Sequence, residues 1–125
     1  MAARTPLTTT DEAADVALNE IRLRGRLAAV PDERTLPSGD AVVTFRLVVD
    51  RPARSLRSAS SARVDTLDCA AFAGPVRRRC RQWKPGDVLE VQGSLRRRFF
   101  RTGGGPASRY EVEVASATRV ARAAG

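Results

Sequence analysis

The sequence contains no histidine, and its only cysteines are Cys69 and Cys80. Without histidine and without a closely spaced cysteine pair, a zinc site is not expected. Asp65 and Asp68 differ in parity along a predicted strand, so they face opposite sides and cannot share a metal ion. No histidine is available as a general base, and no serine or cysteine has a triad partner. We therefore expect no catalytic residue, no metal, no cofactor and no enzymatic activity.

Long apolar runs are also missing. No stretch approaches the length of a membrane span, and the N-terminus lacks the charged-then-apolar pattern of a secretory signal. We expect a cytoplasmic protein that does not bind membranes, in which the reducing compartment leaves the two cysteines unpaired. Its 125 residues suffice for one domain and are too few for two.

What the sequence has in excess is arginine. The chain has 22 basic and 14 acidic residues, a formal net charge of +8, and Lys84 is the only lysine. Such basicity favours a polyanionic partner, nucleic acid first and an anionic membrane surface second. A codon bias towards arginine would explain the scarcity of lysine, but not the excess of positive over negative charge.

Alternation of apolar and polar residues predicts five short strands. They cover residues 19–30, 41–50, 64–72, 87–100 and 109–118. Gly25 falls in the inward register of the first strand, where a strongly bent barrel strand tolerates or needs a missing side chain. Phe45, Leu95 and Tyr110 are assigned to the inward faces of their strands and Glu111 to a polar face. Residues 31–40 are predicted to form a turn.

A helix is predicted between the third and fourth strands, where Val76, Cys80 and Trp83 recur at helical spacing. Pro75 suits an early helix position, and Pro85 with Gly86 ends the helix. We expect Trp83, the only tryptophan, to seal one end of a barrel, and the arginines of the helix to form a solvated surface. Five strands without a second helix indicate a small closed all-β barrel.

Two phenylalanines fall on the polar faces of their strands. Phe72 ends the third strand on the side opposite its apolar residues, and Phe100 shares a face with Arg96 and Arg98. Such a pairing suits unpaired nucleic acid, because it offers a flat surface for a base and cations for phosphates. One β-bulge would exchange Phe99 for Phe100.

The segment from residue 51 to residue 63 carries four arginines and almost nothing to bury. It is long for a hairpin loop, and all four charges share a sign, which favours phosphate contact over a solvated spacer. The glycine-rich segment from residue 101 to residue 108 is predicted to be a hairpin tip. It lacks the lysine and the following helix of a nucleotide-binding loop.

In order and spacing, these segments resemble the bacterial single-stranded DNA-binding proteins over residues 19–120. The pieces that match the family's strands are NEIRLRGRL, SGDAVVTFRLVVD, VDTLDCAAF, GDVLEVQGSLRRRFF and SRYEVEV. The resemblance implies the oligonucleotide-binding (OB) fold, an all-β, five-stranded Greek-key barrel with one short helix between strands three and four. Residues 1–18 would then be a flexible N-terminal extension and residues 121–125 a short C-terminal end.

The resemblance places the family's base-stacking aromatics on Phe72 and Phe100. Two of the family's tryptophans are replaced by Ala53 and Thr66, and each lost stack removes about 1–3 kcal/mol of binding free energy. We expect arginines to offset that loss. The expected nucleic-acid-binding residues are Phe72, Phe100 and Phe99, with Arg46, Arg51, Arg54, Arg57, Arg63, Arg96, Arg98, Arg101 and Arg109 along the phosphates.

The resemblance implies a sequence-tolerant binder of single-stranded DNA that acts in replication, recombination or repair and is nucleoid-associated. Family members are mostly homotetramers built in part by pairing of first strands. Here that strand carries Arg22, Arg24 and Arg26, so a dimer stays an alternative. The sequence ends soon after the last strand, so we expect a secondary member without the acidic tail that recruits repair enzymes. Two other functions stay open, an RNA-binding OB-fold protein and a replisome-accessory module that binds an acidic protein.

Overall fold

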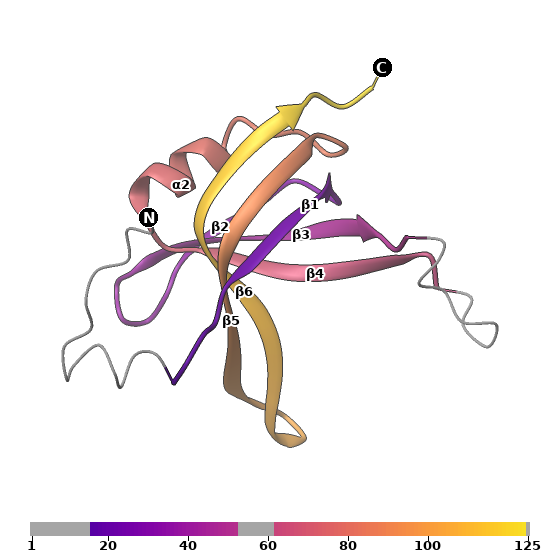
Figure 1. Ribbon diagram of the computed structural model, residues 1–125. Helices are drawn as coiled ribbons and strands as arrows, with labels where there is room; N and C mark the ends of the chain where they lie inside the picture. Colours follow the sequence, from indigo (N-terminus) through magenta and orange to yellow (C-terminus); the bar gives the residue numbers. More distant parts are fainter. Residues whose placement is uncertain (1–15, 53–61, 125) are drawn as a thin grey trace, which may run out of the picture.

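The computed structural model describes residues 16–52 and 62–124 (Figure 1). Within these ranges the elements are β1 (Ile21–Leu27), β2 (Asp32–Thr35), β3 (Ala41–Asp50), β4 (Val64–Ala71), α2 (Gly74–Cys80), β5 (Val88–Thr102) and β6 (Gly105–Ala121). The strand order is β1-β5-β6-β4-β3-β2, and an additional β1–β3 pairing closes five strands into a ring. All pairings are antiparallel except that of β4 with β6. This ring, with its helix between β4 and β5, confirms the expected OB-fold barrel.

Strand β2 corrects the sequence prediction for residues 31–40. That segment is predicted to be a turn, but its first half pairs with β3, from Asp32 opposite Thr44 to Thr35 opposite Ala41. All four residues of β2 are exposed. No apolar alternation therefore marks the strand in the sequence, because hydrogen bonding to the neighbouring strand defines it rather than burial. The turn itself is confined to the residues around Gly39, which has a positive φ of 94°.

Aliphatic side chains from several strands fill the barrel. Leu27, Leu47 and Leu89 are almost fully buried. Phe45 lies in the same cluster, as predicted, and its ring meets that of Trp83 edge to face, with centroids 5.3 Å apart. Trp83 follows α2 in the chain and belongs to the core, as its helical spacing predicts. The one tryptophan is thus a structural residue.

Closure of the barrel depends on Gly25. Strand β1 pairs with β5 along most of its length and with β3 at its end. A Cβ atom at Gly25 would lie 2.4 Å from the carbonyl oxygen of Val48 and 3.0 Å from Cγ2 of Val49. A backbone oxygen cannot move aside as a flexible side chain can. Strand β1 therefore approaches β3 closely at a residue without a side chain, in agreement with the inward position predicted for Gly25.

We expect Gly25→Ala to destabilise the protein by about 1–3 kcal/mol or more, because the new methyl group overlaps backbone atoms. Urea unfolding followed by Trp83 fluorescence measures the change. Gly103→Ala is the matched control, since a Cβ atom there would meet nothing within 4 Å. Equal unfolding midpoints for the two variants would contradict this account of barrel closure.

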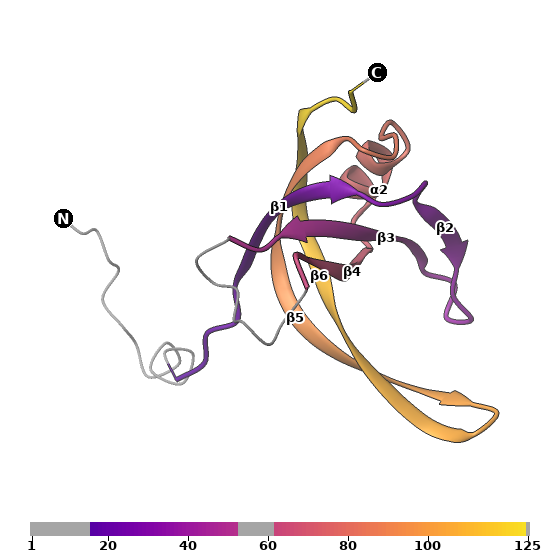
Figure 2. The same ribbon diagram turned by 90° about the vertical axis from the view of Figure 1, so that its right-hand side faces the viewer.

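Strands β5 and β6 continue beyond the barrel as a two-stranded hairpin, seen at the bottom of Figure 1 and curving away from the barrel in Figure 2. The register of the pair shifts twice, between Val88 and Leu89 and between Gln92 and Gly93. At each point β6 has one extra residue, Val120 and Ala115, and such bulges bend a strand. We call residues 96–111 the β5–β6 arm, because β4 pairs with β6 only at Val112 and Glu113.

The arm corrects the predicted burial of three residues. Leu95, at its base, is 41% exposed and Tyr110 is 59% exposed, although both are assigned to the core by alternation. The alternation is present, but no barrel wall faces that side of the hairpin. Glu111 is assigned to a polar face, yet it is only 6% exposed because the guanidinium groups of Arg98 and Arg109 lie beside it.

Asp87 is a buried carboxylate that binds the segment after β6 to the turn before β5. Its Oδ2 accepts a hydrogen bond from the backbone N–H of Lys84 at 2.9 Å, and its Oδ1 accepts one from that of Ala123 at 2.7 Å. The guanidinium of Arg119 lies 3.3 Å from Oδ2. The two backbone hydrogen bonds, followed by Arg119, hold the pKa of Asp87 below its usual value of 3.8.

We expect Asp87→Asn to be less stable than the parent at neutral pH. The lowered pKa means that the carboxylate stabilises the fold at pH values above 3.8, and that this contribution is lost as the pH falls through the folded pKa. Urea unfolding at pH 7 and pH 3 tests this, with exposed Asp32→Asn as the control for net charge. A stability difference between parent and Asp87→Asn that stays the same at both pH values would contradict the role of the charge.

Candidate nucleic-acid interface

Phe72 follows β4 and precedes α2, at the point where the chain leaves the barrel wall. Its side chain is half-buried, and the guanidinium of Arg98 lies 5.4 Å from the ring centroid. Nε of Arg77, in α2, donates a hydrogen bond of 2.9 Å to the carbonyl oxygen of Phe72. Residue 72 thus has two cations from different elements: Arg98 of the arm over its ring, and Arg77 of the helix at its backbone carbonyl.

Phe72, Arg77 and Arg98 line a hollow of ≈ 470 Å³, together with Asp40, Ala41 and Glu113. Sequence reasoning missed Arg77, which is assigned there to a solvated helix surface. Arg77 could have been found from its position five residues after Phe72, in the first turn of the helix. There the backbone N–H of Arg77 donates a hydrogen bond to the carbonyl oxygen of Ala73. An aromatic surface beside guanidinium groups is what an unpaired base and its phosphate require.

Phe100 lies on the same face of the arm as Arg98. The β5–β6 register places Arg98 opposite Arg109 and Phe100 opposite Ala107, and side chains two residues apart share a face. Phe100 is 42% exposed, and the guanidinium of Arg109 lies 5.6 Å from its ring centroid. We call this side, which Arg98 joins to Phe72, the outer face of the arm. Phe99 points to the opposite face, so the considered exchange of Phe99 for Phe100 does not occur.

Most of the arginines predicted to bind phosphate are paired with carboxylates. The pairs are Arg46–Asp68 at 3.2 Å, Arg51–Asp65 at 2.8 Å, Arg96–Glu113 at 3.3 Å, Arg98–Glu111 at 2.5 Å and Arg109–Glu111 at 3.9 Å. Hydrogen bonding to Arg51 lowers the pKa of Asp65, so this pair is charged at neutral pH.

The remaining predicted arginines differ from these. Arg63 and Arg101 are exposed and have no ion pair among the residues that the structure describes. By alternation Arg101 shares a face with Phe99, not with Phe100. Arg54 and Arg57 lie outside the described residues. The predicted set is therefore divided between β3, residues 51–63 and the two faces of the arm.

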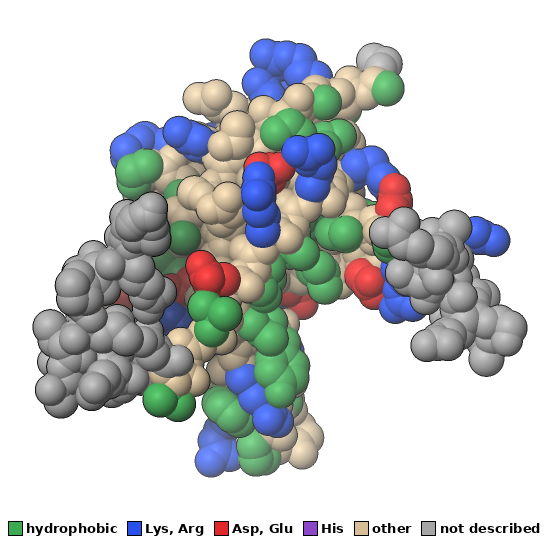
Figure 3. Space-filling model, viewed as in Figure 1, with side chains coloured by type: hydrophobic (Ala, Val, Ile, Leu, Met, Phe, Trp, Pro, Cys, Tyr) green, Lys and Arg blue, Asp and Glu red, His purple; other side chains and the backbone are tan. Residues whose placement is uncertain are grey.

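A second hollow, of ≈ 350 Å³, lies between β3, β4 and the arm. Its lining includes Arg34, Arg46 and Arg109 with Asp68 and Glu111. Arg109 stands opposite Arg98 of the first hollow, so the two hollows flank the outer face of the arm. Figure 3 shows basic side chains spread over the visible surface rather than gathered in one continuous patch. Both hollows combine cations with carboxylates and include a phenylalanine, but Phe45 in the second is a core residue, whereas Phe72 in the first is only half-buried.

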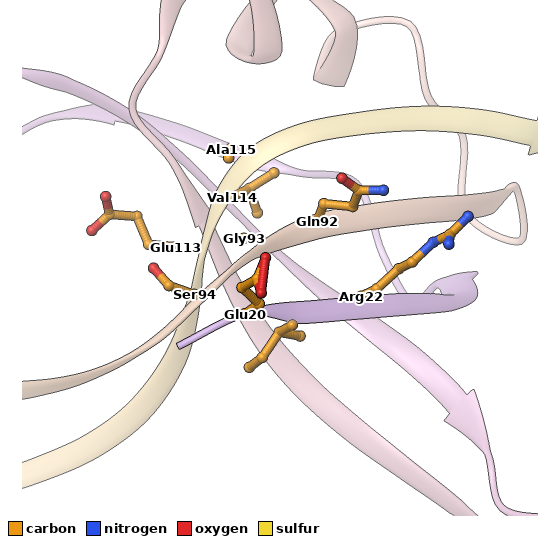
Figure 4. A pocket seen from close by; sticks show the side chains of 9 residues that line it. Glu20, Arg22, Gln92, Gly93, Ser94, Glu113, Val114 and Ala115 are labelled. Atoms are coloured by element: carbon orange, nitrogen blue, oxygen red, sulfur yellow. The ribbon is translucent and has the colours of Figure 1, made fainter. Parts of the chain in front are cut away.

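A larger hollow of ≈ 580 Å³ shares Glu113 with the hollow beside Phe72 and lies where β6 bulges at Ala115 (Figure 4). Glu20, Arg22, Gln92 and Ser94 are among its lining residues. It has no aromatic ring, and its charged groups include Glu20 and Glu113. This hollow does not suit the stacking of a base.

Chemical groups for catalysis are not gathered in the described part of the chain. Burial raises the pKa of Cys69 to about 12 and that of Cys80 to about 11, so both free thiols are protonated at neutral pH and poor nucleophiles. Residues 16–52 and 62–124 contain no cluster of three or more potential metal ligands. Nor do they contain a helix with the length and apolar character that a bilayer crossing requires.

Comparison with known proteins places the chain and its fold in one family. The family model described as the single-strand binding protein family matches residues 18–120. The single-stranded DNA-binding protein of Oceanobacillus iheyensis is 32% identical over 83 residues, which are 66% of this chain and 50% of that protein. Single-stranded DNA-binding protein 3 of Listeria innocua is 31% identical over 83 residues, 66% of this chain and 51% of the relative. The chain thus spans about half the length of these relatives.

A solved structure agrees with the sequence comparison. The Plasmodium falciparum SSB, determined in complex with ssDNA, has a TM-score of 0.66 and 26% identity to this chain, and the match covers 82% of this chain and 92% of that one. Members of the family are non-enzymatic DNA-binding proteins, so the chain is not an enzyme. The matches in sequence and in fold agree, and the chain belongs to the single-strand binding protein family.

Proposed function

We propose that this chain binds single-stranded DNA without sequence preference, through base stacking on Phe72 and Phe100 and arginine contacts to phosphates. The observation that carries the proposal is the half-buried ring of Phe72, which has the guanidinium of Arg98 over it and the guanidinium of Arg77 bonded to its backbone carbonyl. Membership of the family supports it, as does the likeness to an SSB that was solved with ssDNA. Sequence tolerance follows because every base has a flat face and phosphates carry no sequence information.

The outer face prepares both rings for stacking. Arg98 is tied to Glu111 and Glu113, and Arg109 lies near Glu111. Each guanidinium is thereby kept beside an aromatic ring, with charge next to an apolar surface. A bound nucleotide would place its base on the ring and its phosphate near the guanidinium. The exposed loop arginine Arg63 would extend the same interaction to neighbouring phosphates.

We expect Phe72→Ala and Phe100→Ala each to weaken the binding of oligo-dT by about 1–3 kcal/mol, roughly five- to 150-fold. Neither ring is in the core cluster, so both variants should stay folded, with a larger loss of stability for Phe72→Ala because its ring is half-buried. Fluorescence anisotropy with a labelled oligonucleotide measures the affinity. Val120→Ala, which truncates another exposed apolar residue at the far end of β6, is the control. The proposal fails if both phenylalanine variants bind as tightly as this control.

Ion pairing should weaken the electrostatic part of binding. Exposed ion pairs contribute only about 0–1 kcal/mol, so a phosphate can replace a carboxylate partner at low cost. The displaced carboxylate remains nearby, however, and repels the phosphate. Glu113 is placed to do this, because its Oε1 lies 3.3 Å from both Arg96 Nε and Arg98 Nη2.

We therefore expect Glu113→Gln to bind oligo-dT more tightly than the parent at low salt. The plot of log affinity against log salt should steepen by roughly 0.7 for each additional phosphate that is neutralised. Glu90→Gln is the matched control, because it changes the net charge equally but releases Arg22 and Arg24 on β1 instead. Equal affinities and slopes for the two variants would show that only net charge matters, against the proposed local effect.

We also propose that the chain assembles into a homo-oligomer through β1 and acts in DNA replication, recombination or repair in the cytoplasm. The β1–β3 pairing begins only at Arg26, which leaves one edge of Ile21–Gly25 without a partner in this chain's described sheet. Glu90 pairs with both Arg22 and Arg24, which reduces repulsion between two first strands. Light scattering distinguishes a tetramer from a dimer.

A further inference from the structure

The side of the arm opposite Phe100 also exposes aromatic rings. Phe99 is 75% exposed and Tyr110 is 59% exposed, and they stand on neighbouring strands. The guanidinium of Arg97 lies 5.3 Å from the Phe99 ring centroid and 5.4 Å from that of Tyr110. Its Nε and Nη2 donate hydrogen bonds to Ser108 Oγ at 3.2 and 3.1 Å. One anchored cation therefore joins two exposed rings, on what we call the inner face of the arm.

The two faces of the arm differ in charge. On the outer face Arg96, Arg98 and Arg109 are accompanied by Glu111, with Glu113 just beyond. By the β5–β6 register, the residues of the inner face are Arg97, Phe99, Arg101, Pro106, Ser108 and Tyr110. This set contains no carboxylate, and among the described residues none lies within ion-pair distance of Arg97 or Arg101. The inner face combines exposed rings with uncompensated positive charge.

The positive charge of the inner face favours a polyanion over a second copy of the chain as its partner. A second copy of the chain packed symmetrically on this face would bring arginines of both copies together in a partly desolvated interface, which is costly. A polyanion neutralises the same arginines, and its unpaired bases cover the rings. Figure 3 shows apolar and basic side chains intermingled on the visible side of the hairpin, with no acidic ones among them.

We propose that the inner face of the arm is a second binding surface for single-stranded nucleic acid. Bases stack on Phe99 and Tyr110, and phosphates pair with Arg97 and Arg101. The inference rests on the proposed function, since a strand already bound to the outer face passes round the hairpin tip and continues on the inner face. The tip suits that path, because Gly103–Gly105 present no side chains to obstruct it.

Oligonucleotide length separates the two surfaces. Oligo-dT of increasing length is titrated against the parent, Phe99→Ala/Tyr110→Ala and Phe100→Ala, with Phe100 as the matched neighbour on the other face. Short oligonucleotides should bind the double variant as well as the parent. Long ones should bind it roughly five-fold or more weakly, as expected for lost base stacks. Phe100→Ala should lose affinity at every length.

A charge variant provides a second measurement. Arg97→Gln should make the salt dependence shallower by roughly 0.7 in log–log slope for long oligonucleotides, and leave it unchanged for short ones. Trp83 fluorescence confirms that each variant is folded.

Three results would overturn the inference. The first is a double variant that binds as tightly as the parent at all lengths while Phe72→Ala and Phe100→Ala lose affinity; this result leaves the proposed function intact. The second is a molar mass of the double variant, measured by light scattering, below that of the parent; this result makes the inner face an interface between copies. A parent that binds no oligonucleotide removes the proposed function together with the inference.

Discussion

The pairing of β5 with β6 is the interaction on which both the barrel and its candidate binding surface depend. Within the barrel this ladder supplies Leu89, Val91 and Val114 to the core. Beyond Val112 the same ladder continues without a third strand, and no barrel wall faces its inner side. The alternation that buries residues in the barrel therefore exposes them in the arm, first Leu95, then Tyr110 and Phe99. The same β5–β6 pair therefore forms part of the barrel wall where other strands face it, and a hairpin with two accessible faces where none does.

Charge is distributed less simply than the net value of +8 suggests. Cross-strand carboxylates accompany the arginines of the outer face, and Glu90 accompanies those of β1. These pairs orient guanidinium groups beside Phe72 and Phe100 but reduce the local positive potential. The inner face of the arm has the reverse balance, with fewer arginines and no carboxylate. The outer face thus supplies oriented guanidinium groups, and the inner face supplies the net positive charge that attracts a polyanion.

Residue patterns within a strand were enough to predict much of this structure. Alternation gave the faces of Phe72 and Phe100, the burial of Phe45 and the glycine at barrel closure, because each depends on local parity. Strand β2 could not be predicted, since its residues are all exposed and only the edge of β3 defines it. The partners of the arginines depend on cross-strand register, which the extra residues Ala115 and Val120 shift. Arg77 joins Phe72 only through the geometry of the helix start.

We propose that unpaired bases stack on the half-buried ring of Phe72 and on the more exposed ring of Phe100. Photocrosslinking tests it most directly, using oligo-dT that contains 5-iodouracil, followed by peptide mapping of the crosslinked protein. Crosslinks at Phe72 and Phe100 are expected, because crosslinking needs a base in contact with the ring. Crosslinks confined to other surfaces, such as the β1 face around Arg22 and Arg24, with both phenylalanines unmodified, would contradict it.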